Sequence, residues 1–303
     1  MAAIIEVKSL KKNYKTFEAV KGIDFTVEEG SFFSFLGENG AGKSTTINII
    51  STLLKKSFGE IIVNGYEIDK QDQEIRSSIG IVFQNNMLDD FLTVRENVMS
   101  RGRMYGISKP VLNQRINELC LSLDAKEIID KRYGKLSGGQ KRKADIFRAL
   151  IHMPKILILD EPTTGLDPYT RQKVWEVINK LRTEHKLTIF LTTHYMEEAA
   201  QSDYIVIIDK GMIKAQGTPE ALRLKYSYDR LILIPKDKME IRNQLDLLDQ
   251  RYVIEKDKIV VALSHAFESI KILPILQNNL DSFEVIRGNM DDVFINIVKG
   301  AMQ

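Results

Sequence analysis

The eight residues GENGAGKS, from Gly37 to Ser44, constrain the fold of this chain more than any other stretch. They follow the apolar run SFFSFL and lead into KSTTINIISTLL, so the sequence predicts a strand, a glycine-rich turn and a helix in succession. Four residues separate Gly37 from Gly42, and Lys43 and Ser44 follow at once, which is the spacing of a phosphate-binding loop.

The spacing of this loop has a chemical reason. Glycines let the backbone curl so that its N–H groups surround phosphates, while Lys43 reaches the β- and γ-phosphates and the Ser44 hydroxyl can ligate Mg²⁺. An incidental glycine turn is the alternative, and the strand before it and the helix after it disfavour that interpretation. The predicted nucleotide-binding residues of the loop are Gly37, Glu38, Asn39, Gly40, Ala41, Gly42, Lys43, Ser44 and Thr45.

Composition limits the remaining possibilities. A chain of 303 residues with 44% hydrophobic content can bury a substantial core and is expected to form two domains. Its net charge of +2 gives no indication of a protein that coats nucleic acid, and no nucleic-acid partner is expected. Its single cysteine, Cys120, can form no internal disulfide, which is compatible with a reducing cytosol. The start MAAIIEVKSLKK lacks the order of a signal peptide, and no apolar run approaches the roughly 18–20 residues that span a bilayer. We therefore expect a cytoplasmic protein, unless a partner holds it at a membrane.

The first two thirds of the chain have the pattern of an α/β domain. Residues 1–35 are predicted as short strands, IIEVKSL, FEAV, IDFTV and FFSFL, separated by KNYK, KG and EEG. Further strands are expected at GEIIVNG, SSIGIVFQ, KILILDEP, LTIFLTTH and YIVIIDKG, with helices over much of 94–130, at about 168–184 and near 195–201. The later strands are continuously apolar, which predicts a parallel sheet covered by helices on both faces.

The pattern changes after residue 220. The segments RLILIPK, KMEIRNQLDLL, RYVIEKD, KIVVAL, HAFESIKILPILQNN, SFEVIRG and NMDDVFINIVKG predict strand, helix, two strands, helix, strand and helix. This order is that of a small α+β domain of ferredoxin-like type over residues 221–303. No catalytic constellation is found in it, so we expect it to have a binding or regulatory role.

Two carboxylates end a predicted buried strand in KILILDEP. Asp160 would lie at the carboxyl edge of the sheet, where open α/β sheets bind ligands, and is the predicted Mg²⁺ site, through water. Glu161 would project differently, towards an attacking water, and is the predicted general base. Two carboxylates that merely cap the helix after Pro162 are the alternative interpretation.

Two further side chains leave predicted strands at the same edge. His194 follows LTIFLTT and could sense a γ-phosphate, although a lone histidine there is more often a hydrogen-bonded loop residue. Gln84 closes GIVFQ, and its amide suits Mg²⁺ or the water. The predicted catalytic residues are thus Lys43, Gln84, Glu161 and His194, and the predicted Mg²⁺ ligands are Ser44, Gln84 and Asp160.

The octapeptide LSGGQKRK, residues 136–143, opens another predicted helix. Lys141, Arg142 and Lys143 lie in its first turns, where each cation opposes the helix dipole at a cost of about 0.3–1 kcal/mol. They are either solvated surface charges or additions to an anion site formed by the bare N–H groups of Ser137, Gly138 and Gly139.

The motifs GENGAGKST, Gln84, LSGGQ, LILDEP, GLDP at 165–168 and His194 occur in the order and approximate spacing of an ABC transporter nucleotide-binding subunit. The resemblance covers residues 4–220. It implies a P-loop NTPase cassette over residues 1–220: a parallel α/β core, an antiparallel β subdomain and a helical insert at about 88–150. It also implies that Tyr14, in KKNYK, stacks on adenine, although an exposed tyrosine in a strand turn is the plainer interpretation.

The resemblance implies a dimer as well. In such proteins two subunits pair head to tail, and the signature segment of one completes the ATP site of the other. Residues Ser137, Gly138, Gly139 and Gln140 would then meet the nucleotide of the partner chain, where the cationic helix start becomes useful. Asp167, in the GLDP turn, would couple the two sites across the interface. Hydrolysis would be phosphoryl transfer to water.

The run LTVREN and the ending NMDDVFINI resemble the daunorubicin-resistance group of exporter ATPases, although Met290 and Asp291 replace the usual Leu and Glu. This implies an ATPase that drives export through a separate transmembrane permease and is held by it at the inner face of the cell membrane. Drug, peptide, lipid-linked sugar or sodium ion would all fit as cargo. The alternatives are a soluble ABC-type ATPase acting on nucleic acid or ribosomes, and a regulator that binds ATP without turnover.

Overall fold

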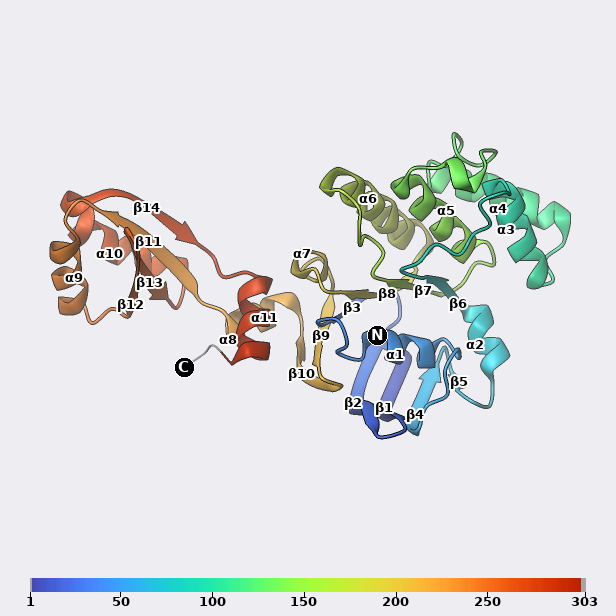
Figure 1. The fold of residues 1–303 in the computed structure, drawn as a ribbon, viewed down its shortest axis with the longest axis horizontal. Coiled ribbons are helices and arrows are strands. Elements are labelled where there is room, and N and C mark those ends of the chain that lie inside the picture. The colour runs from blue at the N-terminus through green and yellow to red at the C-terminus, as the bar shows by residue number, and fades with distance from the viewer. Residues whose placement is uncertain (1, 301–303) are drawn as a thin grey trace. The chain divides into compact units, whose positions relative to one another are not determined.

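The computed structural model describes residues 2–300, and its internal contacts divide the chain into two compact units after Gln216 (Figure 1). The sequence pattern placed this division after residue 220. Helix α8 (Pro219–Tyr226) belongs to the second unit.

The first unit is built on a central sheet whose inner strands are fully buried. In order across the sheet, the strands are β10 (Met212–Gly217), β9 (Tyr204–Asp209), β3 (Phe32–Leu36), β8 (Thr188–Thr193), β7 (Ile156–Asp160) and β6 (Ile79–Val82). From β9 to β6 all neighbours pair in parallel. The strand pattern therefore predicted this sheet correctly, because strands covered on both faces need no polar face.

Successive side chains of these strands enter two different cores. Phe32 and Leu157 pack with the helices α3 (Val94–Met104), α4 (Lys109–Ser122), α5 (Gly138–Leu150) and α6 (Pro168–His185). Phe33 and Ile158 pack with α1 (Lys43–Ile50) and an antiparallel sheet. Figure 1 shows these two layers on opposite sides of the central sheet. Short helices α2 (Asp72–Ser78) and α7 (Met196–Ala199) and a 3₁₀ turn at Tyr133–Lys135 complete the unit.

The antiparallel sheet corrects one expectation about the first 35 residues. It has the order β2 (Phe17–Glu28), β1 (Ala3–Tyr14), β4 (Phe58–Val63) and β5 (Tyr66–Glu67). The pair KG, expected to be a turn, lies inside the continuous strand β2. Gly22 adopts φ 88° there, and the register against β1 shifts between Leu10 and Lys11, so the glycine forms a bulge instead of a turn.

The second unit has the expected order of elements. After α8 come β11 (Asp229–Pro235), α9 (Lys238–Leu247), β12 (Tyr252–Glu255), β13 (Lys258–Leu263), α10 (Ser269–Leu276), β14 (Leu280–Ile286) and α11 (Met290–Lys299), with 3₁₀ turns on either side of α10. The strands form an antiparallel sheet in the order β12-β13-β11-β14. This is the split βαβ arrangement of a ferredoxin-like fold. Within residues 2–300, no helix has the length and apolarity needed to cross a membrane.

Candidate functional site

The glycine-rich loop joins the end of β3 to the start of α1, as the sequence predicted. A Cβ atom on Gly37 would lie 2.4 Å from the carbonyl oxygen of Ile208, which excludes any larger residue. Gly42 adopts φ 109° as the N-cap of α1, and a Cβ there would lie 2.9 Å from the Ala19 carbonyl. Glu38, Asn39, Gly40 and Ser44 are exposed, Thr45 is half-buried and Ala41 is buried.

Lys43 is buried at the first position of α1 and folds back over the loop. Its Nζ donates to the carbonyl oxygens of Gly37, at 2.7 Å, and Glu38, at 3.1 Å. The same ammonium lies 3.3 Å from Oε1 of Glu161, and both side chains are less than a tenth exposed. The lysine is therefore fixed between the loop and a carboxylate of the neighbouring strand.

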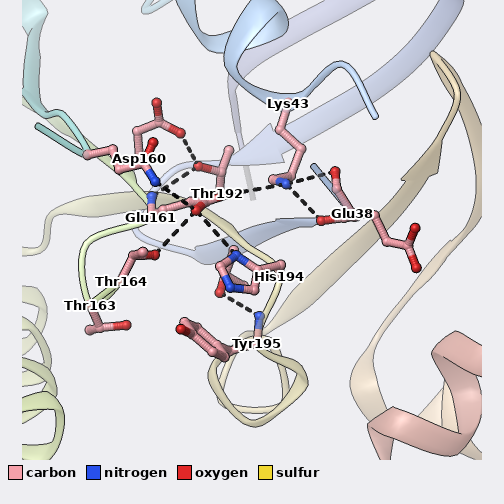
Figure 2. Close-up of polar contacts among 12 residues, drawn as sticks. Glu38, Lys43, Asp160, Glu161, Thr163, Thr164, Thr192, His194 and Tyr195 are labelled. Atoms are coloured by element: carbon pink, nitrogen blue, oxygen red, sulfur yellow. Dashed lines mark hydrogen bonds and ion pairs between the residues drawn. The ribbon is translucent and has the colours of Figure 1, made fainter. Parts of the chain in front are cut away.

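Glu161 is the centre of the polar cluster in Figure 2. Besides the ammonium of Lys43, its carboxylate meets His194, whose Nδ1 lies 3.2 Å from Oε2 without being aligned as a hydrogen bond. The amide Nε2 of Gln84 donates to Oε2 at 3.4 Å, and the Thr164 hydroxyl donates to it at 3.3 Å. Three predicted catalytic side chains from different segments thus converge on the carboxylate of the fourth, Glu161.

Asp160 is buried at the end of β7, and its carboxylate points to a different partner. Thr192 lies beside it in the sheet register, and its hydroxyl donates to Oδ1 of Asp160 at 2.5 Å. Burial raises the pKa of Asp160, and the Glu161 charge adds to this. The Thr192 hydrogen bond, the Lys43 ammonium and the Ser44 hydroxyl lower the pKa. Hydroxyl, carboxylate and amide oxygens are the ligands that Mg²⁺ prefers, so the donor chemistry of Ser44, Asp160 and Gln84 fits this ion.

The LSGGQ segment forms the capped start of α5. The Ser137 hydroxyl accepts from the Gln140 N–H at 3.4 Å, and the Gln140 side chain accepts from the Ser137 N–H at 3.1 Å. This capping box leaves Ser137 and Gly138 exposed. A Cβ on Gly139 would lie 2.4 Å from Cγ2 of Thr170, so this glycine permits close approach to α6.

Asp167 is connected to this segment by Thr170. It is the N-cap of α6, and its carboxylate accepts from the Thr170 N–H at 3.0 Å and the Thr170 hydroxyl at 2.5 Å. These hydrogen bonds hold the pKa of Asp167 below its ordinary value. Thr170 thus donates to Asp167 and packs closely against Gly139.

The three cations at the start of α5 all have partners within the chain. Lys141 Nζ lies 3.2 Å from Oδ1 of Asp90, and Lys143 Nζ donates to the Asp124 carbonyl at 2.9 Å. Arg142 is buried and donates to the carbonyl oxygens of Phe83 and Gln84. Arg142 is thus no solvated surface charge, whereas Lys141 and Lys143 are half-buried beside their partners. The interpretation that these cations add to an anion site stays a prediction.

Tyr14 is not brought into this cluster. It ends β1 opposite Phe17, its side chain is 44% exposed, and the Lys12 ammonium lies 5.1 Å from its ring centre. Stacking of Tyr14 on adenine stays a prediction.

Sequence reasoning missed several residues that hold the cluster in place. In the sequence Thr192 is only a polar residue in an apolar strand. Its role follows from the strand register, which places it beside Asp160. Glu198 is a buried carboxylate that accepts from Thr163, from Thr193 at 2.6 Å and from Trp175 at 3.2 Å. Because Thr193 also accepts from the Tyr195 N–H, Glu198 fixes the turn that carries His194.

Comparisons with known proteins agree with this geometry. The family described as "ABC transporter" matches residues 20–164. The linearmycin resistance ATP-binding protein LnrL of Bacillus subtilis (strain 168) is 34% identical over 97% of this chain and 98% of its own length. The daunorubicin resistance ATP-binding protein DrrA2 of Streptomyces coeruleorubidus is 36% identical over 78% of this chain and 74% of its own.

A solved structure supports the same conclusion. The ATP-binding cassette MJ0796, described as dimeric in a post-hydrolysis state with ADP and Pi, superposes with a TM-score of 0.64 at 30% identity. The match covers 71% of this chain and 98% of the cassette. A relative is matched over nearly its full length, and the chain has the phosphate loop, the acidic strand end and the signature helix. This chain therefore belongs to the family of ABC transporter ATP-binding proteins.

Proposed function

We propose that this chain is the ATP-hydrolysing subunit of an exporter, working as a head-to-tail homodimer with Mg²⁺ on a separate transmembrane permease. The observation that carries the proposal is the convergence of Lys43, Gln84 and His194 on the Glu161 carboxylate. The resistance functions in the names of its relatives support export.

Each side chain of the cluster has a role in phosphoryl transfer to water. Glu161 is the general base, because a carboxylate can take the proton of the attacking water. Lys43 binds the β- and γ-phosphates, and His194 donates to the γ-phosphate, where negative charge develops. Gln84 orients the water through the amide that now contacts Glu161. Ser44, Gln84 and Asp160 would hold Mg²⁺, which would neutralise phosphate charge.

The partner chain supplies the rest of the site. The backbone N–H groups of Gly138 and Gly139, at the amino end of α5, would face the γ-phosphate of the nucleotide bound by the partner. Ser137, whose own N–H donates to the Gln140 side chain, and Gln140 would lie at its edge. Exposure of Ser137 and Gly138 supports this role, as does the dimeric state of the MJ0796 cassette. Asp167 would couple the two sites across the dimer axis.

The permease would dock beside Gln84. An apolar groove of about 590 Å³ lies between β6 and α3, lined by residues that include Ile81, Phe83, Met87 and Met104. Met87 and Met104 are 59% and 74% exposed. Docking in this groove would place the chain at the inner face of the membrane and link permease movement to the end of β6, which leads into Gln84. The cargo stays open among drug, peptide, lipid-linked sugar and sodium ion, and the domain after residue 220 is assigned a binding or regulatory role.

Glu161→Gln tests the catalytic assignment. The amide keeps the size of the side chain but cannot accept the proton, so we expect kcat to fall by about 10²–10⁴-fold. Lys43 retains its two carbonyl partners, so ATP binding should persist. Hydrolysis and binding of a fluorescent ATP analogue are measured in parallel, with the exposed Glu197→Gln as the matched control. Equal rates in wild type and Glu161→Gln would remove the carboxylate from this role.

A further inference from the structure

Two side chains of α5 and that of His152, just beyond this helix, cap the free edge of β6 and of the residue that follows it. This strand ends the central sheet and pairs on one side only, with β7. Carbonyl oxygens of alternate residues point to the same side of a strand. Those of Ile79, Ile81 and Phe83 accept from His152 at 3.0 Å, Arg148 at 2.5 Å and Arg142 at 2.6 Å. Three side chains therefore take the place of a further strand.

Arg142 differs from the other two because it grips two carbonyl groups. One guanidinium nitrogen donates to the Phe83 carbonyl at 2.6 Å, and another donates to the Gln84 carbonyl at 3.1 Å. The planar fork of an arginine holds such a pair in one orientation. Since the Gln84 side chain contacts Glu161 at 3.4 Å, Arg142 fixes the backbone from which this contact is made.

The charge of Arg142 is balanced inside the protein. Arg142 is 4% exposed and Asp145, one turn further along α5, is 2% exposed. The Asp145 carboxylate accepts from the Tyr133 hydroxyl at 3.2 Å. Arg148, 9% exposed, lies on the same helix and shares Asp145 as its counter-charge. Arg142 is therefore held firmly between α5 and β6 and is not free to reorient with solvent.

We propose that Arg142 is a positioning residue that links the signature segment to Gln84 of the same chain. The helix that carries Arg142 begins at Ser137, so binding of the partner's nucleotide at Ser137–Gln140 is transmitted through a single helical turn to the Gln84 backbone. Arg142 thereby holds Gln84 against Glu161, a contact that the single chain already makes, and ties it to the state of the signature segment. This inference rests on the proposed function.

Arg142→Lys tests the link, with Arg148→Lys as its matched control. Lysine keeps the positive charge beside Asp145, but one ammonium cannot hold the two carbonyl groups in the same fork. Arg148 donates to the same strand at Ile81, away from Gln84. Both variants should lose similar thermal stability. Only Arg142→Lys should lower kcat, by about tenfold, and raise the Mg²⁺ concentration at half-maximal rate, because Gln84 is then misplaced.

A Gln84→Ala background separates positioning from structure. If Arg142 acts through Gln84, adding Arg142→Lys to Gln84→Ala should change kcat by less than about twofold. Equal kcat and equal Mg²⁺ half-saturation in the Arg142→Lys and Arg148→Lys proteins would overturn the inference. Failure of both Arg142→Lys and Arg142→Gln to fold would also overturn it, since Arg142 would then be a structural residue. Loss of hydrolysis in Glu161→Gln is scored separately, so the proposed function can stand while this link fails.

Discussion

The backbone at Glu161 has an unusual conformation, which separates the carboxylates of Asp160 and Glu161. Its φ of 46° lies in the left-handed region, where a residue with a side chain costs about 1–2 kcal/mol. The turn directs the Asp160 carboxylate to Thr192 and the Glu161 carboxylate to Lys43 and His194. Local strain of this kind persists where the surrounding contacts over-determine it. The two adjacent carboxylates are thereby separated, as the roles proposed for them at the metal and at the water require.

Ser137 caps its own helix and is assigned to the partner's phosphate, and one substitution separates these roles. Aspartate is as good an N-cap as serine, so Ser137→Asp should keep the free energy of unfolding within about 0.5 kcal/mol of wild type. Its charge would repel the γ-phosphate, so we expect hydrolysis to fall by about 100-fold or more. Ser137→Ala is the control: it loses about 1 kcal/mol of capping but adds no charge. Wild-type turnover by Ser137→Asp would show that this segment does not meet a nucleotide.

At the scale of elements, buried ionisable groups on α5 and just beyond it lie between this helix and the edge of the sheet. Burial raises the pKa of Asp145 to about 6, against the opposing charges of Arg142 and Arg148. Burial lowers the pKa of His152 to about 4. The Nε2 of His152 lies 3.0 Å from the Ile79 carbonyl, and its ring stacks on Tyr105 at 4.0 Å. The neutral imidazole, with its proton on Nε2, satisfies both contacts.

His152 should make the first unit less stable in acid. In the unfolded state His152 binds a proton below pH 6.5, whereas in the folded state it stays neutral down to about pH 4. The free energy of unfolding is therefore highest above pH 6.5 and decreases as the pH falls. Between pH 7 and pH 5 this amounts to at most about 2 kcal/mol. Glutamine can donate to Ile79 but does not titrate, so His152→Gln should show a smaller loss over this range.

Urea unfolding followed by the fluorescence of Trp175 measures this difference, because the single tryptophan is buried in the first unit. His265→Gln, at a histidine with a side chain 67% exposed, is the control. Parallel stability curves for wild type and His152→Gln from pH 7 to pH 5 would contradict the prediction.

The elements show which features can be predicted from sequence. Hydrophobic period and loop spacing predicted the parallel sheet, the phosphate loop and the order of the second unit, because these depend on neighbours in the chain. The KG bulge, the Thr192 bond to Asp160 and the grip of Arg142 on β6 were missed. Each of these contacts depends on how the strands and helices are arranged side by side, and that arrangement is determined by residues far apart in the sequence. The partners of the LSGGQKRK cations were missed for the same reason, since Asp90, Asp124 and Gln84 belong to other segments.

At the scale of the whole molecule, the residues of the proposed reaction lie on two separate parts of the first unit. Lys43, Glu161 and His194 meet around the phosphate loop. Ser137 and Gly138 are exposed at the start of α5, and Asp167 caps the adjacent helix. A homodimer with twofold symmetry would place each signature segment opposite the other chain's loop and form two identical sites.

Mixing two inactive variants tests this arrangement. Glu161→Gln removes the base but keeps the signature intact, whereas Ser137→Asp blocks the signature but keeps the base. In a mixed dimer the loop of the Ser137→Asp chain meets the signature of the Glu161→Gln chain, which restores one complete site. Random pairing puts half of the chains in mixed dimers with one active site in two, so the mixture should recover about a quarter of wild-type activity. Co-purification of one untagged variant with a tagged copy of the other checks that the chains have exchanged. A mixture no more active than the mean of its two components would mean that the signature serves its own chain, since only trans completion makes two dead chains active together.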